Sequence, residues 1–152
     1  MKKTRSPFTV GLPVVMLTLA VVLLGLGVSR SVVSAQDKTV WSGVFTAEQA
    51  ARGKEKAVAE CAACHGMELK GDLAPTLVGP DFIDHWYDAR LGEMALRLQN
   101  TMPQSAPGSL KPEEYADIVA FILLENGFPA GTETLAMTPV DALDAIKITK
   151  TR

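Results

Sequence analysis

Residues 61–65 are Cys61-Ala62-Ala63-Cys64-His65, and a glycine follows directly. Two thiols separated by two residues, with a histidine after the second, are typical of a c-type haem attachment site. Each thiol can add to one vinyl group of the haem, and the vinyls sit on neighbouring pyrroles, so one turn of backbone places both sulfurs. The histidine then lies under the iron and can supply an axial imidazole. The pattern predicts one haem c, covalently attached through Cys61 and Cys64, with His65 as an iron ligand.

The same two-cysteine spacing also occurs in dithiol redox sites and in zinc sites. A dithiol redox site usually accompanies a βαβ pattern, which this sequence does not show. A zinc site needs four ligands, but the chain has no third cysteine and one further histidine, His85. The haem interpretation is therefore preferred to both.

The first 35 residues predict an export signal. Residues 1–5 carry three basic side chains, residues 6–29 carry no charge, and small or apolar residues precede a cleavage site expected after Ala35. An uncleaved anchor is the alternative, because the uncharged run approaches the roughly 20 residues that span a bilayer. In either case residues 36–152 form the expected haem-binding domain, exported to the periplasm. Contact with a membrane is expected only if the leader stays attached.

Charge and cysteine content limit the partners of residues 36–152. Both cysteines belong to the haem motif, so no disulfide framework is expected. Residues 36–152 keep 11 of the 15 lysines and arginines and all 17 acidic residues, a formal charge of −6. An acidic balance of this size argues against nucleic-acid binding and favours partners with neutral or basic docking faces.

The hydrophobic pattern of residues 36–152 predicts three main helices. Thr46 and Gln49 match a capping box, which starts a helix that runs to about residue 60. A second helix is expected over 88–100, and a third from about Pro112 to a C-cap at Gly127. The expected fold class is therefore all-α, with the helices packed around one haem. The apolar stripe of the second helix is Leu91, Met94, Ala95 and Leu98, and that of the third is Tyr115, Ile118, Val119, Ile122 and Leu123.

Other segments are expected to fit around these helices. Gly53 interrupts the first helix, where close approach of the third helix would explain a glycine. Residues 67–80 predict a loop over one haem edge, in which the carbonyl of Pro75 accepts the free N–H of His65. Its apolar side chains, Leu73, Leu77 and Val78, are expected to cover the ring. A turn over 141–146 is expected to pack Leu143 and Ile146 on the body.

The second axial ligand decides what the haem can do. Met102 leaves the second helix and precedes Pro103, which restricts the backbone at this point. A thioether ligand gives a closed iron suited to electron transfer, whereas an open site suits binding or catalysis. Met102 is therefore the predicted partner of His65.

Four other residues are weaker candidates for the same role. Met67 is too near His65 in sequence to reach round the ring. Met94 lies on a helical apolar stripe and Met137 lies in the tail, so packing is expected for both. His85 would give a bis-histidine haem, but no proline or glycine fixes its backbone, and a surface or second-shell position is expected.

With these residues in place, the chain resembles a class I, single-haem cytochrome c. More narrowly, it is similar to the cytochromes that partner, or are fused to, quinoprotein (pyrroloquinoline-quinone) alcohol dehydrogenases. One departure is Ala57, where such cytochromes often have an aromatic residue, so the contact between the first and last helices is expected to be thinner or filled by Tyr115 or Phe121. The stretches that carry the narrower likeness are Trp41-Ser42-Gly43-Val44-Phe45-Thr46, Gln49-Ala50-Ala51-Arg52-Gly53, Ala74-Pro75-Thr76-Leu77-Val78-Gly79-Pro80, Pro107-Gly108-Ser109-Leu110 and Asn126-Gly127-Phe128-Pro129-Ala130-Gly131.

The resemblance implies an exported one-electron carrier and not an enzyme. It implies redox protein partners, with a dehydrogenase as donor and a cytochrome or an oxidase as acceptor. A permanent subunit of a dehydrogenase complex would do the same chemistry, and an exposed apolar patch near Trp41 or Phe128 would favour it. The alternative is a haem protein with an open sixth site that binds ligands or acts like a peroxidase. Near Met102 the sequence offers Gln104 and Ser105 for such a site, but no histidine or arginine.

Overall fold

The computed structural model describes residues 38–151 of the chain. The expected export signal lies outside the described residues. Within 38–151, no helix combines the length and the apolar character needed to cross a membrane. The described part is mostly helical, as the sequence predicts, and the fold class is all-α.

The first main helix, α2 (Ala47–Glu60), begins at the capping box that the sequence predicts. The hydroxyl of Thr46 accepts from the Gln49 backbone, and the Gln49 side chain accepts from the Thr46 backbone, at 3.2 and 3.4 Å. A short helix, α3 (Ala62–His65), follows directly. The haem motif therefore directly follows a well-capped helix, and the end of this helix sets the position of the two cysteines and the histidine.

The helix α2 crosses α6 (Pro112–Glu125), and the crossing point is Gly53. A Cβ at Gly53 would lie 1.8 Å from the Asp117 carbonyl oxygen and 2.9 Å from the Phe121 Cβ, so only glycine fits here. This confirms the close approach that the sequence predicts. Ala57 is fully buried on the same helix, and Phe121 lies at the crossing near Gly53. All five residues of the predicted α6 stripe are buried.

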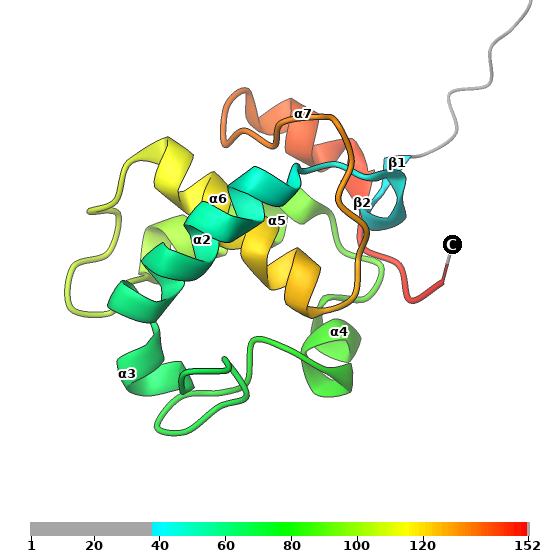
Figure 1. Cartoon of the computed structure of the whole chain (residues 1–152). Coiled ribbons are helices and arrows are strands. Elements are labelled where there is room, and N and C mark those ends of the chain that lie inside the picture. The colour runs from blue at the N-terminus through cyan, green and yellow to red at the C-terminus, as the bar shows by residue number, and fades with distance from the viewer. Residues whose placement is uncertain (1–37, 152) are drawn as a thin grey trace, which may run out of the picture. The chain divides into compact units, whose positions relative to one another are not determined.

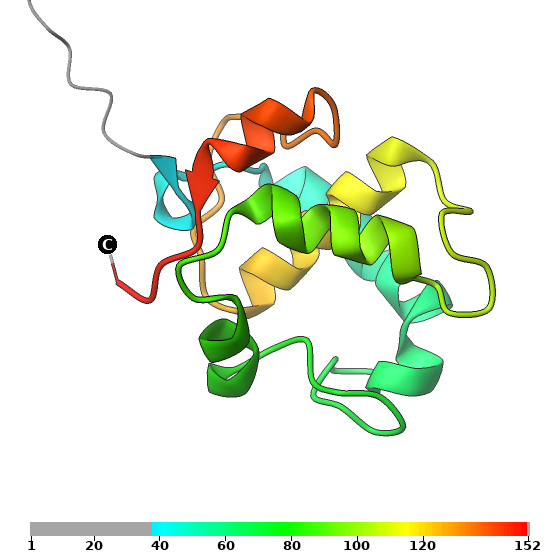
Figure 2. The same cartoon turned by 180° about the vertical axis from the view of Figure 1, so that it is seen from behind.

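The third of the main helices is α5 (Leu91–Thr101), which starts three residues later than the expected 88–100. Asp88 has a left-handed backbone, with φ of 70°, so the helix cannot begin there. Sequence reasoning missed α4 (Pro80–Trp86), although Pro80 occupies the first helical turn, where proline is favoured. Figures 1 and 2 show α5 against α6 from the two sides and α4 beside the loop that follows α3.

The tail closes the fold. The helix α7 (Val140–Asp144) packs Leu143 into the core and lies against α5, which confirms the predicted turn. After it, β2 (Ile146–Lys147) pairs in parallel with β1 (Lys38–Thr39), an association between distant segments that the sequence did not suggest. A 3-10 turn, η1 (Val40–Ser42), follows β1. It carries Trp41, whose indole N–H donates to the Thr149 carbonyl oxygen at 3.0 Å.

Candidate functional site

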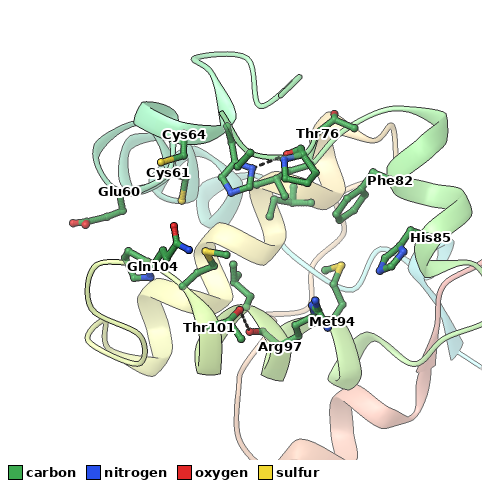
Figure 3. A pocket seen from close by; sticks show the side chains of 18 of the residues that line it. Glu60, Cys61, Cys64, Thr76, Phe82, His85, Met94, Arg97, Thr101 and Gln104 are labelled. Atoms are coloured by element: carbon green, nitrogen blue, oxygen red, sulfur yellow. Dashed lines mark hydrogen bonds between the residues drawn. The ribbon is translucent and has the colours of Figure 1, made fainter. Parts of the chain in front are cut away.

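A cavity of about 680 Å³ lies between α3, the loop after it, α4, α5 and α6, within the roughly 300–1,000 Å³ of pockets that hold cofactors. The predicted site residues Cys61, Cys64, His65 and Met102 all line it. Figure 3 shows Cys61 and Cys64 on one side of this pocket and His85 on the opposite side. Most of the other lining side chains are apolar or aromatic: Leu73, Ala74, Pro75, Leu77, Phe82, Trp86, Met94, Leu98, Pro103 and Ile122.

The two cysteines reach the pocket from the junction of α2 and α3. Cys61 caps α2 and is half-buried, whereas Cys64 is exposed. Burial, followed by the nearby Glu60 carboxylate, raises the pKa of the Cys61 thiol to about 11. A dithiol redox site works through a thiol whose pKa is lowered, so the direction of this shift argues against that chemistry.

The imidazole of His65 is held in one orientation. Its Nδ1 lies 2.7 Å from the carbonyl oxygen of Pro75, the acceptor that the sequence predicts. A carbonyl can only accept, so Nδ1 carries the proton and Nε2 keeps its lone pair for a metal. The residue is 7% exposed, although the chain segment around it lies at the surface. The imidazole is therefore buried, oriented and in the tautomer that an iron ligand needs.

Residues 65–79, which we call the histidine wall, fold by hydrogen bonds of their own and by one side chain from α6. Within the wall, the Gly71 N–H donates to the His65 carbonyl at 2.9 Å, and the Leu77 N–H donates to the Leu69 carbonyl at 2.8 Å. Asn126 then ties the wall to the end of α6. Its amide donates to the carbonyls of Leu77 at 3.0 Å and Ile122 at 2.8 Å, and its side-chain oxygen accepts from the Gly79 N–H at 2.9 Å.

The opposite side of the pocket, residues 94–104, we call the methionine wall. Met102 is the C-cap of α5, as predicted, and its N–H donates to the Leu98 carbonyl at 2.9 Å. The Met102 carbonyl accepts from the hydroxyl of Tyr115 at 2.7 Å. Tyr115 is fully buried in α6, so the backbone of Met102 is anchored to the core at one point. Sequence analysis placed Tyr115 in the core but missed this bond.

The other candidate ligands divide between the pocket and the rest of the domain. Met67 is 69% exposed and Met137 is buried elsewhere in the core, and neither lines the cavity. Met94 is buried on α5 and does line it, so two methionines face the same space. His85 is exposed on α4 and lies at the rim, edge-on to Trp86 with ring centroids 5.0 Å apart.

Two local expectations need correction. Leu73 and Leu77 line the pocket as predicted, but Val78 does not and packs on the core instead. The expectation of no histidine or arginine near Met102 is wrong in three dimensions, because His85 and Arg97 line the same cavity. Arg97 lies close to Met102 in sequence, but its apolar neighbours on the pocket-facing side of α5 dominate the pattern there.

No exposed apolar patch forms near Trp41 and Phe128. Phe128 is 3% exposed, and the two rings meet edge to face with centroids 4.9 Å apart. Their contact stabilises the junction between η1 and the end of α6. The two aromatic residues that could have formed a docking patch for a permanent partner therefore pack against each other.

The donors of this pocket fit a haem c. Two cysteines stand at one side, a buried imidazole with a free Nε2 lies next to them, and a thioether sulfur is available on another wall. The rest of the lining is mostly apolar, which suits a flat aromatic cofactor. The set offers thiols for attachment and His and Met side chains for the iron, the donor combination of cytochromes c.

Comparisons with known proteins agree with this chemistry. Residues 48–122 match a family model described as cytochrome C oxidase, cbb3-type, subunit III. The fold is similar to the crystal structure of the sulfane dehydrogenase SoxCD from Paracoccus pantotrophus. The TM-score is 0.54 at 20% sequence identity, and the match covers 81% of this chain and 68% of that chain. A search of curated proteins found no significant match. The haem motif, the all-α fold and the family match together place this chain among the class I monohaem cytochromes c, electron-transfer proteins that carry one covalently bound haem c.

Proposed function

We propose that this cytochrome is an exported one-electron carrier whose iron is held between His65 and Met102. The observation that carries the proposal is the single cavity lined by Cys61, Cys64, His65 and Met102, in which the Pro75 carbonyl already selects the imidazole tautomer. Cys61 and Cys64 would form the two thioether bonds. A closed His/Met iron has a raised potential and suits electron transfer.

The chain contributes position and environment. The haem, when bound, supplies the one-electron chemistry of its iron. The Pro75 carbonyl fixes the orientation and the tautomer of His65, and Tyr115 holds the backbone from which the Met102 side chain extends. The apolar lining keeps water away from the ring, and a low dielectric tunes the potential. No group of the protein needs to move a proton for this function.

We further propose that the donor is a periplasmic dehydrogenase of the quinoprotein type and that a respiratory cytochrome or oxidase accepts the electrons. The similarity of residues 41–46, 49–53, 74–80, 107–110 and 126–131 to cytochromes of such dehydrogenases supports this donor. The match to a model described as an oxidase subunit supports a place in an electron-transfer chain. The buried Phe128 favours a separate carrier, and the basic, uncharged and small-residue pattern of residues 1–35 supports export.

Optical spectra of the haem-loaded protein test the ligand assignment. The oxidised wild type is expected to show the weak long-wavelength band of a methionine–ferric iron bond, and Met102→Ala is expected to lose it. Met94→Leu is the matched control, because Met94 also lines the pocket, and it is expected to keep the band. Survival of the band in Met102→Ala, or its loss in Met94→Leu, would overturn the assignment of Met102.

The same spectra address an open sixth site, the alternative that the sequence left. An open site would lack the band in the wild type and would bind small ligands without displacing a side chain. A bis-histidine haem with His85 as the sixth ligand is the other alternative; it would also lack the band, and His85→Asn would change its spectrum. With the His/Met pair, His85→Asn leaves the spectrum unchanged.

A further inference from the structure

The pocket of this cytochrome has two chemically different ends. Figure 3 shows Cys61 and Cys64 at one end, with Glu60 next to them, and His85 at the other. Helix α5 runs along the pocket, with Gln104 just beyond its end on the cysteine side and with Met94 and Arg97 toward His85. Glu60 contributes to the raised pKa of the Cys61 thiol, so its negative charge acts at the cysteine end.

Arg97 stands out among the described residues that line the pocket. It is their sole lysine or arginine, and the other α5 residues that line the pocket are the apolar Met94 and Leu98 and the uncharged Thr101. Its guanidinium makes no hydrogen bond or ion pair within residues 38–151, although six ion pairs form elsewhere in that part of the chain. Its backbone carbonyl accepts from the Thr101 hydroxyl at 2.7 Å, a contact that does not involve the guanidinium. A cation therefore faces the cofactor space without a protein counter-ion.

The chemistry of haem predicts what such a cation would meet. The two vinyl groups and the two propionate carboxylates of a haem lie at opposite edges of the ring. Attachment at Cys61 and Cys64 therefore directs the carboxylates toward the end with Arg97 and His85. A guanidinium pairs with a carboxylate through two parallel N–H···O bonds, a geometry that lysine cannot reproduce. Glu60 repels carboxylates from the other end, so the charges of both ends favour the same orientation.

We infer that Arg97 is a positioning residue that binds a haem propionate and thereby raises the reduction potential of the iron. The inference rests on the proposed attachment at Cys61 and Cys64. A bare propionate stabilises the ferric state, which has one more positive charge, and pairing with a cation offsets this effect. His85 and Trp86 present further N–H groups at the same end, while Asp81 is an exposed carboxylate in the lining that opposes the effect.

Reduction potentials of the full haem-loaded protein test this role. Arg97→Gln is expected to lower the reduction potential, so that the ferrous-to-ferric ratio at a fixed ambient potential falls about threefold. This corresponds to roughly 28 mV, because a tenfold change in the ratio is 59 mV for one electron. Arg97→Lys keeps the charge but loses the paired bonds, and it is expected to fall between wild type and Arg97→Gln. Lys54→Gln removes the same charge from an exposed position of α2 outside the pocket, and its potential is expected to stay at the wild-type value.

A second readout reports the contact itself. The propionate bending bands in the resonance Raman spectrum are expected to shift in Arg97→Gln and Arg97→Lys and to stay unchanged in Lys54→Gln. Equal potentials in Arg97→Gln and Lys54→Gln would overturn the inference. A wild-type potential and wild-type bands in Arg97→Lys would also overturn the inference. The positive charge alone would then account for the potential, without paired hydrogen bonds to a propionate. The methionine–iron band is recorded on each variant, so a failure of the ligand proposal is seen separately.

Discussion

The two walls of the pocket are held in different ways. The histidine wall, residues 65–79, is an irregular loop, yet backbone hydrogen bonds cross it. The side chain of Asn126, the C-cap of α6, makes two bonds to the wall and one to Ile122. The methionine wall belongs to a regular helix, α5, but ends at a cap whose backbone meets the core through one hydroxyl, that of Tyr115. The irregular wall thus has the denser anchoring near its predicted ligand.

This difference has a physical basis. A loop has no helical ladder to satisfy its N–H and C=O groups, so other partners must do so if the loop is to stay in one conformation. A helix satisfies its own backbone until its last turn, where carbonyls lose their partners. We therefore expect many hydrogen bonds to hold the backbone around His65 and few to hold the backbone around Met102. Substitutions at Asn126 and Tyr115 distinguish the two walls.

The largest effect is expected at Asn126. Asn126→Leu removes the amide donor for the carbonyls of Leu77 and Ile122 and the acceptor for the Gly79 N–H, all part-buried groups. Each unpaired group costs free energy, so a loss of about 2 kcal/mol in the free energy of unfolding is expected. Guanidinium unfolding of the haem-loaded protein, followed by circular dichroism, measures it.

Asn126→Asp is the matched control for that experiment. It keeps an acceptor for Gly79 but faces the two carbonyls with a carboxylate oxygen in place of the amide. We expect a loss of stability in this variant too, with the methionine–iron band unchanged in both variants. Loss of that band in Asn126→Leu, with wild-type stability, would contradict the assignment of Asn126 to the histidine wall.

A smaller and more local effect is expected at Tyr115. Tyr115→Phe leaves the Met102 carbonyl without its donor and removes nothing from the ring packing. A net hydrogen bond contributes about 1 kcal/mol, so displacement of Met102 by added imidazole is expected to become about fivefold easier. Optical titration of the ferric protein with imidazole measures this ratio. An unchanged imidazole affinity would mean that Tyr115 does not anchor the methionine wall.

The smallest effect is expected from an ion pair that lies outside both walls and joins α2 to α6. Lys56 on α2 pairs with Glu114 on α6 at 2.8 Å. This hydrogen bond, with help from the Lys111 backbone N–H, lowers the pKa of Glu114 from its ordinary value of 4.5. The folded state therefore binds this proton more weakly than the unfolded state. The stabilisation is present above about pH 4.5 and disappears as the pH falls through the lowered pKa.

Glu114→Gln is thus expected to be less stable than the wild type near neutral pH, and the two stabilities are expected to converge in acid. Denaturant unfolding at a series of pH values measures the gap. Glu114 also accepts from the Lys111 N–H at the start of α6. Measuring Lys56→Gln alone and combined with Glu114→Gln separates the contribution of the ion pair from that of this cap. A gap that persists in strong acid would assign the effect to something other than the ionised carboxylate.

Sequence reasoning succeeded where one segment contains the whole signal. The capping box at Thr46, the buried stripe of α6 and the turn that packs Leu143 all depend on residues within a few positions of one another. Gly53 and the Pro75 carbonyl were also predicted, because a glycine in a helix and a rigid proline beside the motif each suggest a specific partner.

The missed features depend on residues far apart in sequence. The bond from Tyr115 to Met102, the bridge from Asn126 to the histidine wall and the pairing of β1 with β2 have no local periodicity. The helix α4 is too short to show a clear apolar stripe. Arg97 escaped attention because the apolar members of its helical face dominate the pattern.

The pairing of β1 with β2 also brings the two ends of the described domain next to each other. Lys38 and Ile146 are partners in the parallel ladder, so the chain enters and leaves the folded body at neighbouring points. A unit whose entry and exit coincide can be spliced into a loop of a larger protein, or joined to a neighbour at either end, with little distortion of the host. Evolution and protein engineers can therefore use this cytochrome fold as an interchangeable electron-transfer module.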